Sequence, residues 1–384
     1  MTDSAPLDIF LAVPPGLETL LAEEAAAAGF APATPVPGGV EVQGSWEDAW
    51  RANLVLRGPS RVLVRLGGFR AMHLAQLDKR ARKFPWGDVL RPGAPLRIEA
   101  VCRKSRIYHD RAAAQRVAAA ISETLGAPIA TPGAEGEGAE GDALRLQVRI
   151  EDDWCSFSID TSGALLHKRG FKHAVGKAPM RENMAALFLR RCGFDGSAPV
   201  LDPMCGSGGF VIEAAEMAAG LVPGRARGFA FERLASFDRD AWEALRARHA
   251  ATPADPWEGP LFYGSDRDAG AVRGALQNAE RAGVAPLCRF REKPAGSIKP
   301  PEGAPGLVIV NPPYGARIGE VRKLRPLYGT LGKTLAERFK GWRVGIVTSE
   351  AQLARATGLP FGEPDAPVAH GGLKVRLWRT GPLA

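Results

Sequence analysis

The tetrapeptide NPPY has the residue types best suited to chemistry, and it directly follows the apolar run GLVIV. A planar base amine has its lone pair delocalised into the ring, so transfer to that nitrogen requires the amine to be held and rehybridised. Side-chain and backbone oxygens could accept its two N–H bonds, an aromatic ring could stack on the base, and consecutive prolines stiffen the turn. The structural alternative is a rigid strand-to-loop turn with an exposed tyrosine. The predicted catalytic residues are Asn311, Pro312, Pro313 and Tyr314.

A glycine-rich turn follows a second apolar strand, in the stretch PVLDPMCGSGGFVIEAA. In open α/β sheets, ligands bind at the carboxyl ends of strands, where glycines let the backbone approach closely. The position that a dinucleotide fingerprint reserves for a third glycine holds Val211, and the GK[ST] of a nucleoside triphosphate loop is absent. An acid at the strand end, Asp202, followed by Gly206 and Gly208, suits a cofactor that carries an ammonium and a sulfonium but no phosphate. The turn therefore predicts S-adenosylmethionine.

A second carboxylate, Asp266, ends the next recognisable strand in FYGSDRDAGAV. It could accept hydrogen bonds from both hydroxyls of a ribose, which supports the same cofactor. Taken singly, Asp202 and Asp266 could instead be helix N-caps.

These motifs lie in a C-terminal half where helices alternate with nearly continuous apolar strands: APVLD, LFYGSD, APLCRF, GLVIV and WRVGIVTS. Such strands are typical of an open parallel sheet covered by helices. The N-terminal part predicts α+β structure, with a helix from Ser45 to about Leu56 capped by Ser45, a helix over 74–84, and a helix from Asp110 to Leu125. The stretch APIATPGAEGEGAEGDAL predicts a solvated loop.

Length and composition predict two or three folded domains, since the chain has 384 residues, of which 45% are hydrophobic and 24% charged. The formal charge of +8 favours a polyanionic partner. Ten basic residues against three acidic ones lie between Lys79 and Arg111, interleaved with Phe84, Trp86 and Tyr108. Interleaved basic and aromatic residues suit RNA phosphate contact with base stacking, the alternative being a solvated face over buried aromatics. The predicted RNA-binding residues are Lys79, Arg82, Lys83, Arg103, Lys104, Arg106, Lys168 and Arg169.

The five cysteines are scattered and form no CxxC or metal-type spacing, which favours reduced thiols in a cytosol. No bound metal is expected. The N-terminus lacks a secretory pattern and no window reaches the ~20 apolar residues of a membrane span. We expect a cytoplasmic, monomeric protein.

The order of these motifs resembles the class I, Rossmann-like amino-methyltransferases with NPPY and, more narrowly, the bacterial THUMP-containing family that makes N2-methylguanosine in 23S ribosomal RNA. The stretches VCRKSRIYHDRAAAQRVAAAI, LLHKRGFK, APMRENMAALFLRRCGF and GFAFERLASFDRDAW support the resemblance beyond the site motifs. It implies a ferredoxin-like part at 1–65, a THUMP domain at 66–165 and a methyltransferase domain at 166–384. It also implies an insertion between Gly220 and Trp257. The implied cofactor-binding residues are Met180, Arg181, Glu182, Asn183, Asp202, Met204, Gly206, Gly208, Asp266 and Arg267.

The chain departs from this family at two places. Lys293 and Pro294 stand where relatives often carry an acid for the adenine amine. The chain ends with LWRTGPLA, so one reaction is expected. The sequence leaves three alternatives open: a transfer RNA guanine-N2 methyltransferase, a DNA adenine-N6 methylase, and a catalytically silent RNA-binding or ribosome-assembly factor.

Overall fold

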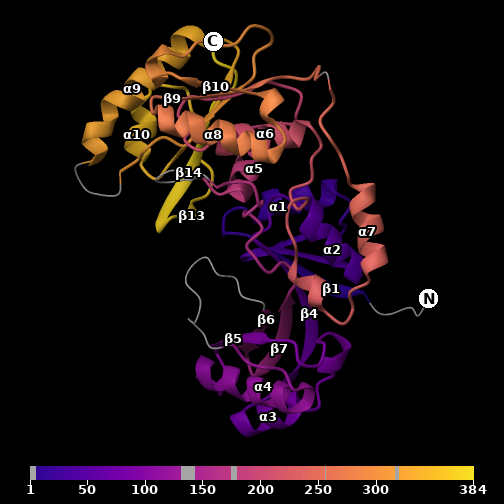
Figure 1. The fold of residues 1–384 in the computed structure, drawn as a ribbon. Helices are drawn as coiled ribbons and strands as arrows, with labels where there is room; N and C mark the ends of the chain where they lie inside the picture. The colour runs from indigo at the N-terminus through magenta and orange to yellow at the C-terminus, as the bar shows by residue number, and fades with distance from the viewer. Residues whose placement is uncertain (1–5, 131–142, 174–179, 256, 316–319) are drawn as a thin grey trace. The chain divides into compact units, whose positions relative to one another are not determined.

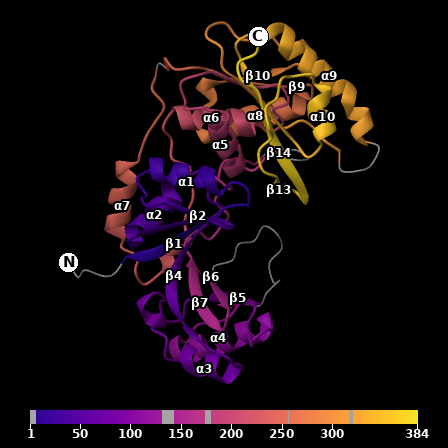
Figure 2. The ribbon, with the colours of Figure 1, turned by 180° about the vertical axis from the view of Figure 1, so that it is seen from behind.

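In the computed structural model, the described residues are 6–130, 143–173, 180–255, 257–315 and 320–384. They form two compact units that are interleaved along the chain (Figures 1 and 2). The first unit takes residues 1–12, 25–166 and 227–249, and the second takes 13–24, 167–226 and 250–384. The predicted boundary at 165/166 lies beside the change of unit after Leu166. Most of the stretch predicted as a solvated loop, residues 131–142, lies outside the described residues.

One seven-stranded sheet runs through the first unit in the order β2-β3-β1-β4-β7-β6-β5. The long strand β4 pairs with β1 on one side and β7 on the other, so both α+β parts predicted from the sequence share one sheet. The predicted boundary at 65/66 falls inside β4, at a register shift between Arg65 and Gly67. The strands are β1 Leu7–Ala12, β2 Thr34–Val36, β3 Gly39–Gly44, β4 Arg61–Arg70, β5 Leu96–Arg103, β6 Leu144–Glu151 and β7 Trp154–Asp160.

The helices of this sheet follow the sequence signals closely. Helix α2 (Trp46–Val55) starts at Ser45, whose hydroxyl accepts the Asp48 N–H at 3.2 Å while Asp48 accepts the Ser45 N–H at 2.9 Å. This reciprocal cap confirms the predicted helix start. Helix α4 has the predicted bounds, and α3 lies beside it over the β5–β7 end of the sheet (Figure 1). The helices of this unit are α2 Trp46–Val55, α3 Leu74–Ala81, α4 Asp110–Leu125 and α7 Arg239–Arg248, with 3-10 turns η1 Trp86–Asp88 and η2 Ala230–Arg233. Helix α1 (Glu18–Ala27) begins in the second unit and ends in the first.

Residues 227–249, which we call the insertion arm, pack on the first unit. Phe231 stacks on Trp50 with ring centroids 5.7 Å apart, and Trp242 meets Phe231 edge-on at 4.9 Å. Arg227 donates to the backbone carbonyls of Ala164 at 2.6 Å and Leu165 at 2.8 Å. Buried aromatic contacts of this kind explain why the arm groups with the first unit, whereas the sequence placed it within 166–384.

The second unit contains another seven-stranded sheet, in the order β10-β9-β8-β11-β12-β14-β13. Strands β8 to β12 are parallel, as predicted, and β14 is antiparallel to β12 and forms an edge hairpin with β13. The strands are β8 Val200–Asp202, β9 Phe262–Asp266, β10 Cys288–Glu292, β11 Leu307–Val310, β12 Arg343–Thr348, β13 Val368–His370 and β14 Leu373–Arg379. The helices are α5 Glu182–Arg191, α6 Gly209–Ala218, α8 Ala269–Ala282, α9 Glu320–Arg338 and α10 Ala351–Ala356, with η3 Ala285–Leu287 and η4 Ala295–Ser297.

The strand order of this sheet reverses beside β8. The chain runs outward from β8 through β9 to β10, then returns to the other side of β8 with β11. The carboxyl ends of β8 and β11 therefore flank the switch point, where open α/β sheets bind their ligands. Among the described residues, no helix is long and apolar enough to cross a bilayer.

Candidate active site

The carboxylate of Asp202 closes strand β8 in a nearly dry environment. Its side chain is only 2% exposed, and its Oδ1 accepts the Met204 N–H at 3.0 Å. Burial first, and then the nearby charge of Asp266, raise the pKa of Asp202 to about 8. Because the N-cap of the following helix α6 is Gly208, Asp202 is not the helix cap that the alternative interpretation allowed.

The glycine turn between β8 and α6 is tightly held. Gly206 and Gly208 have φ of +51° and +86°, a region that favours glycine. A Cβ on Gly208 would lie 3.0 Å from Ile212 Cδ1 and 3.2 Å from the Ala275 Cβ, so no side chain fits without a shift. Asn278 Nδ2 donates to the Ser207 carbonyl at 3.0 Å from helix α8. The turn is thus fixed before any ligand binds.

Asp266 lies at the end of β9, the strand next to β8, and ties the two motifs together. Its Oδ2 accepts the Gly206 N–H and its Oδ1 accepts the Asp268 N–H, both at 3.0 Å. The N-cap of α8 is Asp268, which accepts the Gly270 N–H at 2.7 Å. The N-cap interpretation therefore applies to Asp268 and not to Asp266. Each Asp266 oxygen keeps a lone pair for a further donor.

Two carboxylates thus stand beside one glycine turn, and among the described residues neither Asp202 nor Asp266 forms an ion pair. Their mutual repulsion is part of what raises the pKa of Asp202. A cationic ligand would relieve this repulsion, since a nearby positive charge favours the ionised form of a carboxyl group. These two carboxylates therefore suit a cofactor that carries positive charge.

The predicted flanking segment 180–183 lies against the same turn. A Cβ on Gly209 would come within 3.8 Å of the Met180 carbonyl oxygen. Lys172 Nζ donates to that carbonyl at 3.2 Å and pairs with Glu182 at 2.7 Å. Arg181 is the exposed N-cap of α5, and Asn183 is buried. Of the other predicted cofactor residues, Met204 is half-buried and Arg267 is exposed.

The NPPY turn begins where β11 ends. Since Val308 is in register with Leu201 of β8, Asn311 and Asp202 belong to the same edge of the sheet. Pro312 is buried and Tyr314 is only 8% exposed, which differs from the exposed tyrosine of the structural alternative. Burial raises the pKa of the Tyr314 hydroxyl.

Tyr328 of helix α9 is a residue that the sequence interpretation missed. It is fully buried and its hydroxyl donates to the Pro313 carbonyl at 3.2 Å. This hydrogen bond holds the NPPY turn against helix α9. Helix α9 contains none of the sequence motifs. Only the position of Tyr328 on an apolar helical face could have indicated that it is buried.

The end of strand β10 bears on the expected lack of an acidic residue at Lys293 and Pro294. Lys293 uses its backbone N–H to donate to the Asp266 carbonyl at 2.9 Å, and Pro294 precedes the 3-10 turn η4. An acid does stand at this strand end, one residue earlier, because Glu292 is the exposed register partner of Asp266.

The residues predicted to bind RNA fall into two groups. Lys79, Lys83 and Arg82 are exposed on or just after α3, but Arg82 pairs with Asp78 at 2.9 Å and with Glu123. The aromatic residues beside them face inward, with Trp86 2% exposed and packed on Phe84 and Phe157. Trp86 is a core residue and the half-buried Phe84 packs on it, so neither ring is an open stacking platform.

The second group of predicted RNA-binding residues lies at the end of β5 and is exposed to solvent. Arg103, Lys104 and Arg106 are all exposed, and Tyr108 beside them is 72% exposed. Trp154, 48% exposed, follows Asp153, which accepts the Arg106 N–H at 2.8 Å. Here basic groups and accessible rings do occur together.

Lys168 and Arg169, the two residues at the predicted domain junction, differ in exposure. Lys168 is exposed, but Arg169 is 2% exposed and pairs with Glu213 at 3.3 Å, with both side chains about 1% exposed. A buried guanidinium cannot reach a phosphate at the surface, so we remove Arg169 from the RNA-binding set.

Comparison with known proteins agrees with this arrangement. Residues 169–363 match the model of the RMKL-like methyltransferase domain, and residues 8–63 match that of the RlmL ferredoxin-like domain. A ribosomal RNA large subunit methyltransferase K/L from Methylococcus capsulatus is 35% identical over 97% of this chain and 50% of its own length. A putative RNA methyltransferase from Synechocystis sp. is 30% identical over 96% of this chain and 95% of its own. The chain spans about half the length of the K/L relatives it matches.

Solved structures share the whole fold. A "predicted N6-adenine-specific DNA methylase" from Listeria monocytogenes has a TM-score of 0.84 at 29% identity, covering 98% of this chain and 97% of its own. A putative methyltransferase complexed with SAH has a TM-score of 0.83 at 25% identity, covering 99% of each chain. With the family model matched across the glycine turn, Asp266 and NPPY, the chain belongs to the RMKL-like methyltransferase family.

Proposed function

We propose that this protein transfers a methyl group from S-adenosylmethionine to the exocyclic N2 amine of a guanine in RNA, with 23S ribosomal RNA as the substrate. The observation that carries the proposal is the pairing of β8 with β11, which brings the Asp202 turn and the Asn311 turn to one switch point. The names of the K/L relatives support the choice of ribosomal RNA, and the neighbour with SAH supports the cofactor.

The cofactor fits the first half of this site. When bound, it supplies a methyl group activated by a sulfonium. Asp266 would accept hydrogen bonds from its ribose hydroxyls, while Gly206, whose Cβ position is open, would let the cofactor approach the protein backbone. Gly208 would let the turn pack closely on α8. The segment from Met180 to Asn183 would cover one side, and the charge of Asp202 would be stabilised by the cofactor's cation.

The acceptor fits the second half. Asn311 Oδ1 and the Pro312 carbonyl accept the two N–H bonds of the amine, and Tyr314 packs on the base ring. Preorganised acceptors hold the amine in a reactive geometry and require no rearrangement during transfer. The contact from Tyr328 to the Pro313 carbonyl keeps that geometry fixed.

The competing functions differ in product. Labelled cofactor is incubated with undermethylated ribosomal RNA, with transfer RNA and with DNA, and each is digested to nucleosides for mass spectrometry. N2-methylguanosine in ribosomal RNA supports the proposal, whereas the same product only in transfer RNA changes the substrate. N6-methyladenosine would overturn the base, and no product on any of them would favour a silent RNA-binding factor.

Replacing Asp266 with alanine should weaken binding of S-adenosylmethionine about ten- to a hundredfold. The lost hydrogen bonds to a charged acceptor contribute about 1.5–3 kcal/mol. Isothermal calorimetry measures the change. Asp268→Asn is the matched control, since it alters a carboxylate two residues away that caps α8. Equal affinities for Asp266→Ala and wild type would remove Asp266 from the cofactor site.

Removing the charges of Arg103, Lys104 and Arg106 together should weaken RNA binding and flatten its salt dependence. Each lost phosphate contact lowers the logarithmic slope by about 0.7–0.9. Fluorescence anisotropy across a potassium chloride series measures the slope, and cofactor affinity should stay constant. Arg82→Gln is the comparison, and its effect should be smaller because Asp78 and Glu123 already pair with Arg82. Identical slopes for the triple variant and wild type would exclude this surface.

A further inference from the structure

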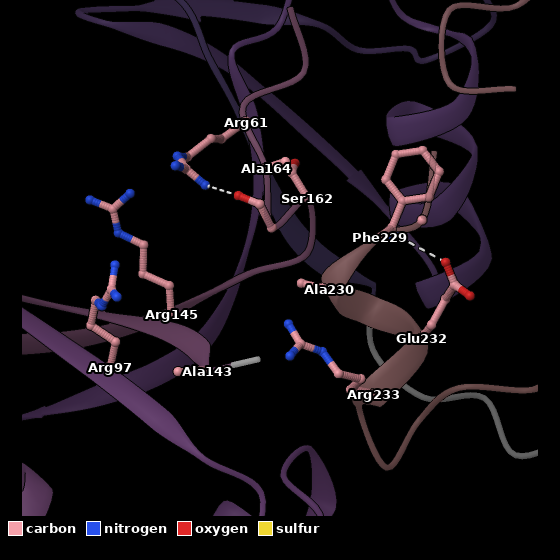
Figure 3. Close-up of a pocket in the computed structure, with 12 residues that line it drawn as sticks. Arg61, Arg97, Ala143, Arg145, Ser162, Ala164, Phe229, Ala230, Glu232 and Arg233 are labelled. Carbon is pink, nitrogen blue, oxygen red and sulfur yellow. Dashed lines mark hydrogen bonds between the residues drawn. The ribbon is translucent and has the colours of Figure 1, made fainter. Parts of the chain in front are cut away.

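A cavity of about 390 Å³ lies within the first unit, between its sheet and the insertion arm. A volume of this size is in the range of small-molecule sites, so it can hold a nucleotide-sized group. Figure 3 shows arginine side chains reaching it from both sides. The arginines in its lining are Arg61 of β4, Arg97 of β5, Arg145 of β6 and Arg233 of η2.

Two of these arginines face each other directly. Arg97 and Arg145 are register partners on the parallel strands β5 and β6, and both are only partly exposed. Like charges directly opposite each other destabilise a sheet, and partial burial adds a desolvation cost. The buried Nε of Arg145 has no hydrogen-bond partner among the described residues. A bound anion would offset the repulsion between the two guanidiniums, so this pair suits an anion site.

The insertion arm supplies the opposite wall. It is fixed there by the Phe231 N–H, which donates to the Thr161 carbonyl at 3.0 Å. Arg233 lines the cavity from this side. The neighbouring Glu232 accepts the Phe229 N–H at 2.8 Å, and Figure 3 shows its carboxylate turned toward Phe229 and away from the three strand arginines. The arm thus adds a cation to the cavity while directing its own anion elsewhere.

Among the residues that the structure describes, two carboxylates that pair with these arginines partly offset the positive charge. Asp160 pairs with Arg61, which also donates to the Gly163 carbonyl, and Glu99 pairs with Arg145. A guanidinium has five N–H donors, so one carboxylate partner orients it and leaves donors for a second anion. Among the described residues, the lining contains four guanidiniums and one carboxylate.

We propose that this cavity binds a backbone phosphate of the RNA. A guanidinium can donate two parallel hydrogen bonds to the oxygens of a phosphate. Several guanidiniums around one cavity therefore bind a phosphate more strongly than single arginines on an open surface do. The choice of RNA as the source of the phosphate rests on the proposed function. None of the four arginines belongs to the RNA-binding residues predicted from the sequence.

The test uses the full chain and a fluorescein-labelled fragment of large-subunit ribosomal RNA, without cofactor. Anisotropy is measured from 50 to 300 mM potassium chloride for Arg97→Gln, Arg233→Gln and the double variant. Each single change should weaken binding at low salt about tenfold or more and lower the logarithmic slope by about 0.7–0.9. Because both arginines hold one phosphate, the double variant should lose little further slope. Arg239→Gln is the control, an exposed arginine six positions along the same arm.

Other outcomes separate the alternatives. Losses no larger than for Arg239→Gln, or slopes that add in the double variant, would overturn the shared phosphate. Titration with inorganic phosphate tests the source, because variants that lose inorganic phosphate but keep RNA affinity would assign the cavity to a free anion. Thermal melting is the folding control: Arg97→Gln should melt at the wild-type temperature, and a lower value would make Arg97 structural. Methyl transfer does not enter this assay, so its failure is distinguishable from failure of the proposed function.

Discussion

Replacement of Asn311 by alanine should lower turnover about 10²–10³-fold, the scale expected for one preorganised polar contact to the reacting group. The side-chain oxygen would be lost from the edge of the sheet where β8 and β11 meet, while the backbone of the turn stays braced by Tyr328. Single-turnover transfer of labelled methyl to ribosomal RNA measures the effect. Affinities for RNA and cofactor should remain at wild-type values.

Asn311→Asp is the matched variant, because a carboxylate still accepts the amine N–H bond. It should recover part of the lost turnover without changing the melting temperature. Loss of RNA or cofactor affinity in Asn311→Ala, in proportion to the lost turnover, would instead make Asn311 a binding or structural residue. The prediction for this residue would then fail even if the product proved to be N2-methylguanosine.

Arg169→Ala should destabilise the protein by about 3–5 kcal/mol, because it leaves the carboxylate of Glu213 buried without its cation. Urea unfolding followed by circular dichroism measures the loss. The neighbouring exposed change, Lys168→Ala, is the control and should have little effect on the unfolding midpoint.

A double change distinguishes this mechanism from simple loss of packing. Arg169→Met combined with Glu213→Leu removes both charges and keeps most of the volume, and such exchanges are often neutral or stabilising. The double variant should therefore be more stable than Arg169→Met alone, which keeps the volume but leaves the Glu213 carboxylate in place. If these two variants unfold alike, then the loss in Arg169→Ala comes from packing and not from charge.

The sequence predicted well those features that depend on neighbouring residues. The cap at Ser45, the bounds of α4, the glycine turn and the NPPY turn each follow from local chemistry, and the structure places them as expected. The apolar strands of the second sheet were recognisable because burial on both faces leaves a continuous apolar run.

The features that the sequence did not reveal depend on contacts between distant segments. Arg169 lies in a basic stretch, and only its pairing with Glu213, 44 positions along the chain, shows that it is buried. Arg97 and Arg145 become opposed only through the register of β5 and β6, across 48 positions. Tyr328 likewise reaches Pro313 from another helix. Periodicity and capping signals cover a few turns of chain and cannot encode such pairings.

The insertion arm has a consequence for synthesis on the ribosome. Trp50 of the first unit packs on Phe231 and Phe237, so part of this core is completed by residues made long after its sheet. At about 5–20 residues per second, the interval between Leu166 and His249 lasts roughly 4–17 s. During that time the nascent first unit has an uncovered aromatic face and lacks Arg233. We therefore expect the yield of native protein to depend on the translation rate between these two positions and on chaperones that bind exposed aromatic surface.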